Sequence, residues 1–320
     1  MRKILFMLIN VFFIIVLTSC NSLKIQECNP IYAMSATINV TFYNTDDYQK
    51  HYNEIKKIYY LYNSISSDFE ANDGNVALLN NIRKMTASNE LIDLINAALL
   101  MQEKTNGYYN PFVGRLSHLW KDAIKNKYVL DEETINKELD IINNTSITIN
   151  NNEIELVGDG NLDLGGIAKG YATQKVYEYL NNQNVTSYLI NAGESNIIFG
   201  DKNKDIFKIG LEKPYHNDFI KIVPAKNNAI GTSSGKYQNV VIDNVRYHHL
   251  LNPFTGMPSN IYDNVNVMCI DSMLCDVYAT AIFSMDLDTA KKFASDNNID
   301  VILFKDNKII YETDGWNTYA

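Results

Sequence analysis

The most informative stretch of this 320-residue chain is Leu162-Asp163-Leu164-Gly165-Gly166-Ile167-Ala168-Lys169-Gly170-Tyr171-Ala172. It predicts a short apolar strand that enters paired glycines and leads directly into a helix. Glycines let the backbone approach a ligand closely, the first helical turn has free N–H groups, and Lys169 adds a positive charge there. The junction therefore favours an anion-binding site, although turns of this kind also occur as plain connections.

The N-terminus indicates export. Basic residues precede an apolar run at 4–17, which ends in Leu17-Thr18-Ser19-Cys20. A basic start, an apolar run and small residues before a cysteine are typical of a bacterial lipoprotein signal. An uncleaved transmembrane helix is the alternative, but the run is short for a span. We expect residues 1–19 to be a signal peptide and Cys20 to carry a lipid anchor on the extracytoplasmic face of the membrane.

The rest of the chain reads as a polar tether at 20–31 followed by one folded domain at 32–320. No linker rich in Pro, Gly or Ser, no repeat and no low-complexity block interrupts it, and its length is enough for a large core. The net charge of −9 and the lack of clustered Lys and Arg argue against nucleic acid as a partner.

Helices and strands alternate irregularly along the domain. Apolar spacing predicts helices at 46–62, at 88–105 with Ser88 as N-cap, at 167–181, and from Asp276 and Asp288 onward. Strands are predicted at 36–43, 187–191, 206–211 and 265–270, with hairpins at 146–149 with 153–157 and around Asp306-Asn307. Mixed order with hairpins is typical of the α+β class.

Apart from Cys20, the chain holds Cys28, Cys269 and Cys275. Cys269 and Cys275 could form a disulfide if a turn at 271–273 brings them together. We favour the other interpretation, in which both are buried apolar thiols.

Asp276 and Thr280 stand four residues apart, so on a helix their oxygens face the same way, close to the expected helix N-terminus. A carboxylate and a hydroxyl, with waters and substrate phosphates, are typical ligands of Mg²⁺. An Asp N-cap followed by a core threonine is the competing interpretation.

His249 is the best candidate for proton transfer. Only five histidines occur, and His248 and His249 stand together before the turn Asn252-Pro253-Phe254-Thr255-Gly256. Histidine accepts a proton near neutral pH, as removal of a hydroxyl proton requires. A hydrogen-bonded surface histidine is the alternative.

Four further blocks accompany the Gly-Gly junction in a fixed order. They are Thr105–Leu116 with Trp120, Ser234-Gly235-Lys236-Tyr237, His248–Pro258 and Asp276–Ala281. Together the blocks resemble the ApbE family of FAD:protein FMN transferases, extracytoplasmic enzymes that use Mg²⁺ to move FMN from FAD to a Thr or Ser of another protein. The resemblance extends from about Ala33 to Trp316.

The resemblance implies one domain with a mixed, largely antiparallel sheet and packed helices. It implies Mg²⁺ held by Asp276, Thr280 and the Gly166 carbonyl, with FAD as substrate in contact with Lys169. His249 matches the family's histidine block and becomes the expected base, while His248 would point to the opposite face of an extended segment.

The same resemblance implies further flavin contacts at Met34, Asn110 and Asp163. Phe69, Tyr108 and Tyr109 could stack on the adenine or isoalloxazine rings, with a place in the core as the alternative. Some positions depart from the family pattern. Tyr109-Asn110-Pro111 stands for Phe-Asp-Pro, Gly74-Asn75 stands for Ser-Glu, and Glu194 replaces a glycine. Asparagine keeps an acceptor but drops the charge, so these changes affect adenine and ribose affinity more than the chemistry.

The implied reaction releases AMP as an extracytoplasmic flavoprotein, such as a redox-complex subunit or an FMN-binding domain, receives FMN. Two alternatives stay open. Water could attack in place of the acceptor, which would make the protein a Mg²⁺-dependent FAD pyrophosphatase. The protein could also be a non-catalytic, lipid-anchored flavin-binding protein.

Overall fold

The computed structural model describes residues 23–193, 195–202 and 205–317. The predicted signal peptide, Cys20 and Glu194 lie outside the described residues. In this part of the chain, no helix has both the length and the apolar character needed to cross a membrane.

One nine-stranded sheet organises the described residues, and neighbouring strands in it pair antiparallel. In sheet order its strands are β1 (Ile25–Glu27), β3 (Ala36–Tyr43), β7 (Tyr188–Ala192), β8 (Asn196–Phe199), β11 (Asn228–Ser234), β14 (Asn264–Cys269), β15 (Asp300–Lys305) and β16 (Lys308–Glu312), with β2 (Ile31–Ala33) beside β1 on β3. This confirms the α+β class and a largely antiparallel sheet.

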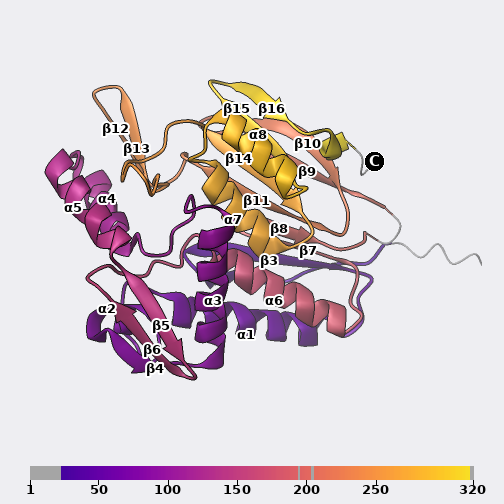
Figure 1. The fold of residues 1–320 in the computed structure, drawn as a ribbon. Coiled ribbons are helices and arrows are strands. Elements are labelled where there is room, and N and C mark those ends of the chain that lie inside the picture. Colours follow the sequence, from indigo (N-terminus) through magenta and orange to yellow (C-terminus); the bar gives the residue numbers. More distant parts are fainter. Residues whose placement is uncertain (1–22, 194, 203–204, 318–320) are drawn as a thin grey trace, which may run out of the picture.

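Helices cover one face of this sheet (Figure 1). They are α1 (Tyr48–Ser66), α6 (Ala168–Asn182), α7 (Ser272–Ile282) and α8 (Leu287–Asp296). α7 packs on β11 and β14, and α6 contacts α7 on one side and α1 on the other. Apolar side chains from this sheet face, such as Val265 and Val267, join the helices in the larger core.

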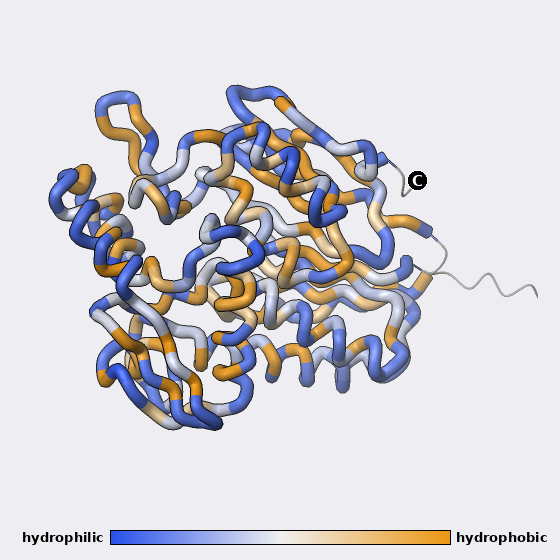
Figure 2. The backbone as a smooth tube through the Cα atoms, viewed as in Figure 1, coloured by the Kyte–Doolittle hydropathy of each residue, from blue (hydrophilic) through white to orange (hydrophobic). Residues whose placement is uncertain are grey.

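The opposite face of the sheet has its own smaller core. Alternate side chains of the same strands, such as Ile230, Met268 and Ile302, point to this side because neighbours in a strand face opposite ways. They are covered by the hairpin of β9 (Phe207–Glu212) and β10 (Phe219–Ala225) and by Trp316 of the short helix η1 (Asp314–Asn317). Figure 2 shows apolar residues recurring along these inner segments.

The remaining elements form the side of the molecule that carries α4 (Figure 1). They are α2 (Val76–Ile82), α3 (Asn89–Lys104), α4 (Gly114–Asn126), α5 (Glu132–Asn143), the sheet of β4 (Lys84–Thr86), β6 (Glu153–Val157) and β5 (Ser146–Asn150), and the hairpin of β12 (Asn239–Ile242) and β13 (Val245–His248). α4 contacts both strands of that last hairpin.

Several predicted elements have the expected bounds. The strand at 36–43 is β3, and the 146–157 hairpin is β5 with β6. Ser88 caps α3, where its hydroxyl accepts a hydrogen bond from the Leu91 N–H at 3.2 Å.

Three predictions about local structure are wrong. Residues 25–27 are strand β1, paired with β3, so the sheet starts inside the predicted tether. The segment before the paired glycines is extended but is no strand, because its only bridge joins Asn161 to Val113. α7 begins at Ser272, capped by the Asp271 carboxylate, so Asp276 is the fifth residue of the helix and no cap.

The cysteine prediction also needs correction. Cys269 and Cys275 form a disulfide, with their Cα atoms 5.9 Å apart, rather than two separate thiols. Cys269 is the last residue of β14 and Cys275 lies in the first turn of α7. The turn between these two elements brings the cysteines close enough to bond. Cys28 is free.

Candidate active site

The Gly-Gly turn is held from both sides by backbone contacts. The Asn80 side chain donates to the Leu162 carbonyl at 2.9 Å and accepts from the Leu162 N–H at 2.8 Å. The Asp163 N–H donates to the Pro111 carbonyl at 2.8 Å. The Asn80 amide thus satisfies both backbone polar groups of Leu162, as a paired β-strand would, and holds this segment in place. Sequence reasoning missed this role of Asn80.

Asp163 closes the turn. Its Oδ1 accepts a hydrogen bond from the Gly165 N–H at 2.7 Å, and its Oδ2 lies 3.7 Å from the Lys121 ammonium. The carboxylate is nearly buried, with 14% of the side chain exposed. Asp163 thus shapes the Gly-Gly turn and links it to α4.

Asp276 of α7 reaches across to the first turn of α6. Its Oδ2 accepts a hydrogen bond from the Gly170 N–H at 2.8 Å. A Cβ on residue 170 would lie 2.5 Å from the Asp276 Cβ, so only glycine permits this approach. Burial raises the pKa of Asp276 to about 6, against the opposing effects of Lys169 and the Gly170 N–H.

The other two predicted metal ligands lie beside each other. A Cβ placed on Gly166 would be 3.6 Å from the Thr280 methyl carbon, and Thr280 Oγ1 donates to the Asp276 carbonyl at 3.1 Å. Gly166, Asp276 and Thr280 therefore gather where α6 meets α7. The sequence spacing predicted the Asp–Thr pair, and the fold brings the glycine to it.

This donor set fits Mg²⁺, which prefers oxygen ligands and retains several waters. It offers one carboxylate, one hydroxyl and one backbone carbonyl. The described residues contain no group of three or more His, Cys, Asp or Glu side chains placed to hold a metal ion. Transition-metal sites rich in His or Cys are a poorer match to these donors.

Tyr109 packs beneath this group. It is 4% exposed, and its ring lies 3.2 Å from a Cβ built on Gly166. Burial and the charges of Asp163 and Asp276 raise its pKa well above the usual value. Its buried hydroxyl has no hydrogen-bond partner among the described residues. A buried hydroxyl without a partner, close enough to Asp163 and Asp276 to feel their charge, indicates a site completed by a ligand or water.

His249 follows β13 and is half-buried. Its Nδ1 lies 3.2 Å from the Tyr237 carbonyl oxygen. A carbonyl can only accept, so Nδ1 carries the proton and Nε2 keeps a lone pair. Burial lowers the pKa of His249, the hydrogen bond to Tyr237 opposes this, and Lys169 and Lys121 lower it further. The imidazole is neutral at pH 7, as a general base requires.

His248 lies in a different environment from His249. It is 1% exposed and packs edge-to-face on Phe283, and its Nδ1 accepts a hydrogen bond from the Leu250 N–H at 3.2 Å. Burial, with a smaller effect of His249, lowers its pKa to about 4. His248 therefore has a packing role on the opposite face of the segment.

The other predicted flavin-contact residues make contacts of their own with different segments. Tyr108 packs edge-to-face on Phe254 at 5.0 Å. Met34 sits in the left-handed turn before β3, where its N–H donates to Asn63. The Asn110 side chain is engaged locally, because it accepts from the Phe112 N–H at 2.9 Å.

Phe69 is the most exposed of the predicted flavin contacts. It is 71% exposed, and its ring stacks on His118 of α4 with centroids 5.5 Å apart. The Lys121 ammonium lies 4.7 Å from the same ring. Sequence reasoning missed both α4 residues, although their spacing of three places them on one helix face.

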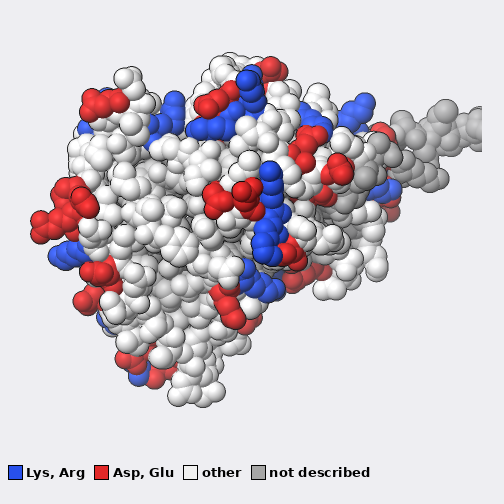
Figure 3. All heavy atoms as spheres, turned by 45° about the horizontal axis from the view of Figure 1, so that its top comes forward, with Lys and Arg blue, Asp and Glu red and all other residues white. Residues whose placement is uncertain are grey.

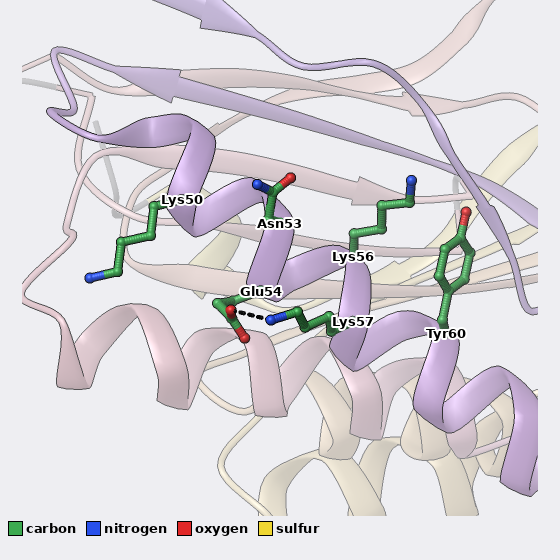
Figure 4. A pocket seen from close by; sticks show the side chains of 6 residues that line it. All are labelled: Lys50, Asn53, Glu54, Lys56, Lys57 and Tyr60. Carbon is green, nitrogen blue, oxygen red and sulfur yellow. Dashed lines mark hydrogen bonds and ion pairs between the residues drawn. The ribbon is translucent and has the colours of Figure 1, made fainter.

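Two hollows open on the protein surface. One follows the outer side of α1 and is lined by Lys50, Asn53, Glu54, Lys56, Lys57 and Tyr60 (Figure 4). Lys57 is paired there with Glu54 at 2.6 Å. The second is lined by residues of α2, α4 and α5 and of the 159–161 segment. Neither contains a predicted catalytic or metal residue.

Comparison with known proteins agrees with this architecture. The ApbE family model matches residues 34–303. The FAD:protein FMN transferase of Klebsiella pneumoniae (strain 342) is 29% identical over 210 residues, 64% of this chain and 65% of that protein. A protein of the same name from Vibrio cholerae is 28% identical over 242 residues, 73% of this chain and 70% of that protein.

The fold matches as well. The crystal structure of the ApbE protein from Thermotoga maritima aligns with a TM-score of 0.82 at 24% identity, over 92% of this chain and 99% of that one. A single α+β domain built around a Gly-Gly turn and an Asp–Thr helix defines the class. The chain belongs to the ApbE family.

Proposed function

We propose that this protein transfers FMN from FAD to a Thr or Ser of an extracytoplasmic acceptor protein and releases AMP. The observation that carries the proposal is the meeting of three parts. They are the Gly-Gly turn with Lys169, the Asp276–Thr280 pair of α7 and the neutral His249. Membership of a family whose relatives bear this name supports it.

The turn and the metal ligands would bind the FAD pyrophosphate. The Ala168 and Gly170 N–H groups at the start of α6 are already bonded to the Leu164 carbonyl and to Asp276. The helix would therefore act on the phosphates through the positive end of its dipole and through Lys169 in its first turn. Gly166, Asp276 and Thr280 would hold Mg²⁺, which when bound neutralises phosphate charge.

His249 would supply the base. Its Nε2 would accept the proton of the acceptor hydroxyl as that oxygen attacks the phosphorus on the FMN side. The new bond joins acceptor oxygen to phosphorus, the bond from phosphorus to the bridging oxygen breaks, and AMP leaves with that oxygen. The Tyr237 carbonyl holds the tautomer in which Nε2 is unprotonated.

The decisive experiment incubates the purified protein with FAD, Mg²⁺ and an extracytoplasmic flavoprotein that carries an acceptor Thr or Ser. Intact mass then reports whether the acceptor gains one FMN, and chromatography reports AMP. AMP without a mass gain would favour a pyrophosphatase. Bound FAD without AMP would favour a binding protein.

The acceptor class is proposed from chemistry and location. On the face drawn in Figure 3, Lys and Arg side chains lie among Asp and Glu rather than in the continuous basic surface that nucleic acid requires. The predicted lipid anchor would put the site outside the cytoplasm, where redox-complex subunits and FMN-binding domains are candidate acceptors.

Cys20→Ala is expected to block lipidation and signal processing. The cysteine supplies the thiol that carries the lipid, and a multiply acylated cysteine anchors a protein stably where one chain does not. Labelling cells with a palmitate analogue and fractionating their membranes measures the effect. Cys28→Ala is the matched control and should label normally, and labelling of Cys20→Ala would contradict the anchor.

A further inference from the structure

We propose that Lys121 is a second phosphate-binding cation of this site and contacts the pyrophosphate of the dinucleotide substrate. The identity of that substrate rests on the proposed function. Lys121 lies in α4, whereas Lys169 lies in α6, so the two lysines would approach the phosphates from different elements.

The Lys121 ammonium is held by ion pairs but makes no short hydrogen bond within the described residues. Its ammonium lies 3.7 Å from Asp163 Oδ2 and 3.9 Å from Asp68 Oδ2, and 4.7 Å from the Phe69 ring. Both ion-pair distances exceed those of hydrogen bonds, which lie at 2.7–3.2 Å. Within the described residues the ammonium therefore has ion pairs that fix its place while its N–H donors lack short acceptors.

The two carboxylates use their short hydrogen bonds elsewhere. Asp68 Oδ2 lies 2.7 Å from His118 Nε2, and Asp163 Oδ1 accepts from the Gly165 N–H at 2.7 Å. Burial pushes the pKa of Asp68 upward, but His118 and Lys121 outweigh it and the pKa is lowered. The acids balance the lysine charge and leave its three donors for a further acceptor.

Lys121 lies close to the proposed reaction centre. Asp163 belongs to the Gly-Gly turn, so its partner Lys121 lies against the proposed phosphate site. Lys121 of α4 and Lys169 of α6 are both close enough to His249 for their charges to lower its pKa. A phosphate oxygen is an acceptor that the open N–H donors of Lys121 would suit.

The test compares ligands with and without phosphates. Lys121→Gln should weaken binding of FAD and of ADP about ten- to hundredfold, the loss of one hydrogen bond to a charged group. Riboflavin, which has no phosphate, should bind as before. Flavin fluorescence and calorimetry supply the dissociation constants. Lys125→Gln, one turn further along α4 and exposed, is the matched control and should bind all three ligands normally.

Two results would overturn the proposal. Equal weakening for riboflavin and FAD would make Lys121 a clamp between Asp68 and Asp163, and unchanged FAD and ADP affinity would leave it no part in binding. Melting temperatures separate misfolding from either result, and Lys121→Arg should restore phosphate binding in part. Failure of wild-type protein to transfer FMN would count against the proposed function only, since the binding comparison needs no turnover.

Discussion

Asp276→Ala is expected to abolish AMP release from FAD, the largest loss that any single substitution should cause. Asp276 is the only carboxylate among the three proposed Mg²⁺ ligands, and it also receives the Gly170 N–H. Its removal takes the charge from the metal site and a hydrogen bond from the start of α6. AMP is measured by chromatography across a Mg²⁺ titration.

Thr280→Ala is the graded comparison. It removes a neutral ligand, so we expect a higher Mg²⁺ requirement with activity partly retained. If Asp276→Ala still releases AMP in the presence of a chelator, the metal hypothesis is wrong.

Asp276→Asn separates charge from hydrogen bonding. The amide oxygen still accepts from Gly170, but the buried charge is gone. The folded pKa of about 6 lies above the unfolded 3.8, so the ionised carboxylate destabilises the metal-free protein above about pH 6 by about 3 kcal/mol. This penalty disappears below about pH 4. Without metal, Asp276→Asn should therefore melt higher than wild type near pH 8, and Mg²⁺ should stabilise wild type only.

His249→Ala is expected to leave FAD binding largely intact and to slow FMN transfer on the order of 10²–10⁴-fold, the usual effect of losing a general base. The groups proposed to hold phosphate and metal lie on α4, on α6 and the turn before it, and on α7, so affinity should survive. Flavin fluorescence gives the affinity and acceptor mass gives the rate. Wild-type transfer by His249→Ala would refute this role.

His248→Ala is the matched control for the neighbouring histidine. Its side chain fills space beside Phe283 and Gly235, so alanine should lower the melting temperature. Transfer per folded molecule should stay near the wild-type rate. A reversal of the two phenotypes would exchange the assigned roles.

The sequence predicted features that depend on nearby residues. Alternation over 36–43 identified β3, and Ser88 identified the start of α3, because strand period and capping are local. His248 and His249 were also predicted to face opposite ways, because successive side chains of an extended segment alternate between its two faces. These signals do not need knowledge of the tertiary fold.

Features that depend on distant partners were missed. Asn80 binds the backbone of Leu162, 82 residues away, and His118 and Lys121 meet Phe69 only once α4 is in place. The turn of the β12–β13 hairpin could have been recognised in the sequence. Its two residues, Asp243 and Asn244, both adopt positive φ, and Asp and Asn are residue types that tolerate this conformation in two-residue hairpin turns. The sequence predicts the start of α7 at Asp276, whereas the helix begins at Ser272 and its cap, Asp271, lies five residues before Asp276.

The pairing of β1 with β3 limits how far the domain would extend from a membrane anchor at Cys20. Ile25 lies opposite Tyr43, at the far end of β3 from Met34. In the proposed lipidated form, residues 21–24 are all that separates Cys20 from β1, and the chain from Cys20 to Ile25 spans at most about 18 Å. β3 itself spans about 25 Å. The Met34 end of the domain would then stay within about 43 Å of the bilayer surface, and the height of an acceptor hydroxyl would become a criterion of substrate choice.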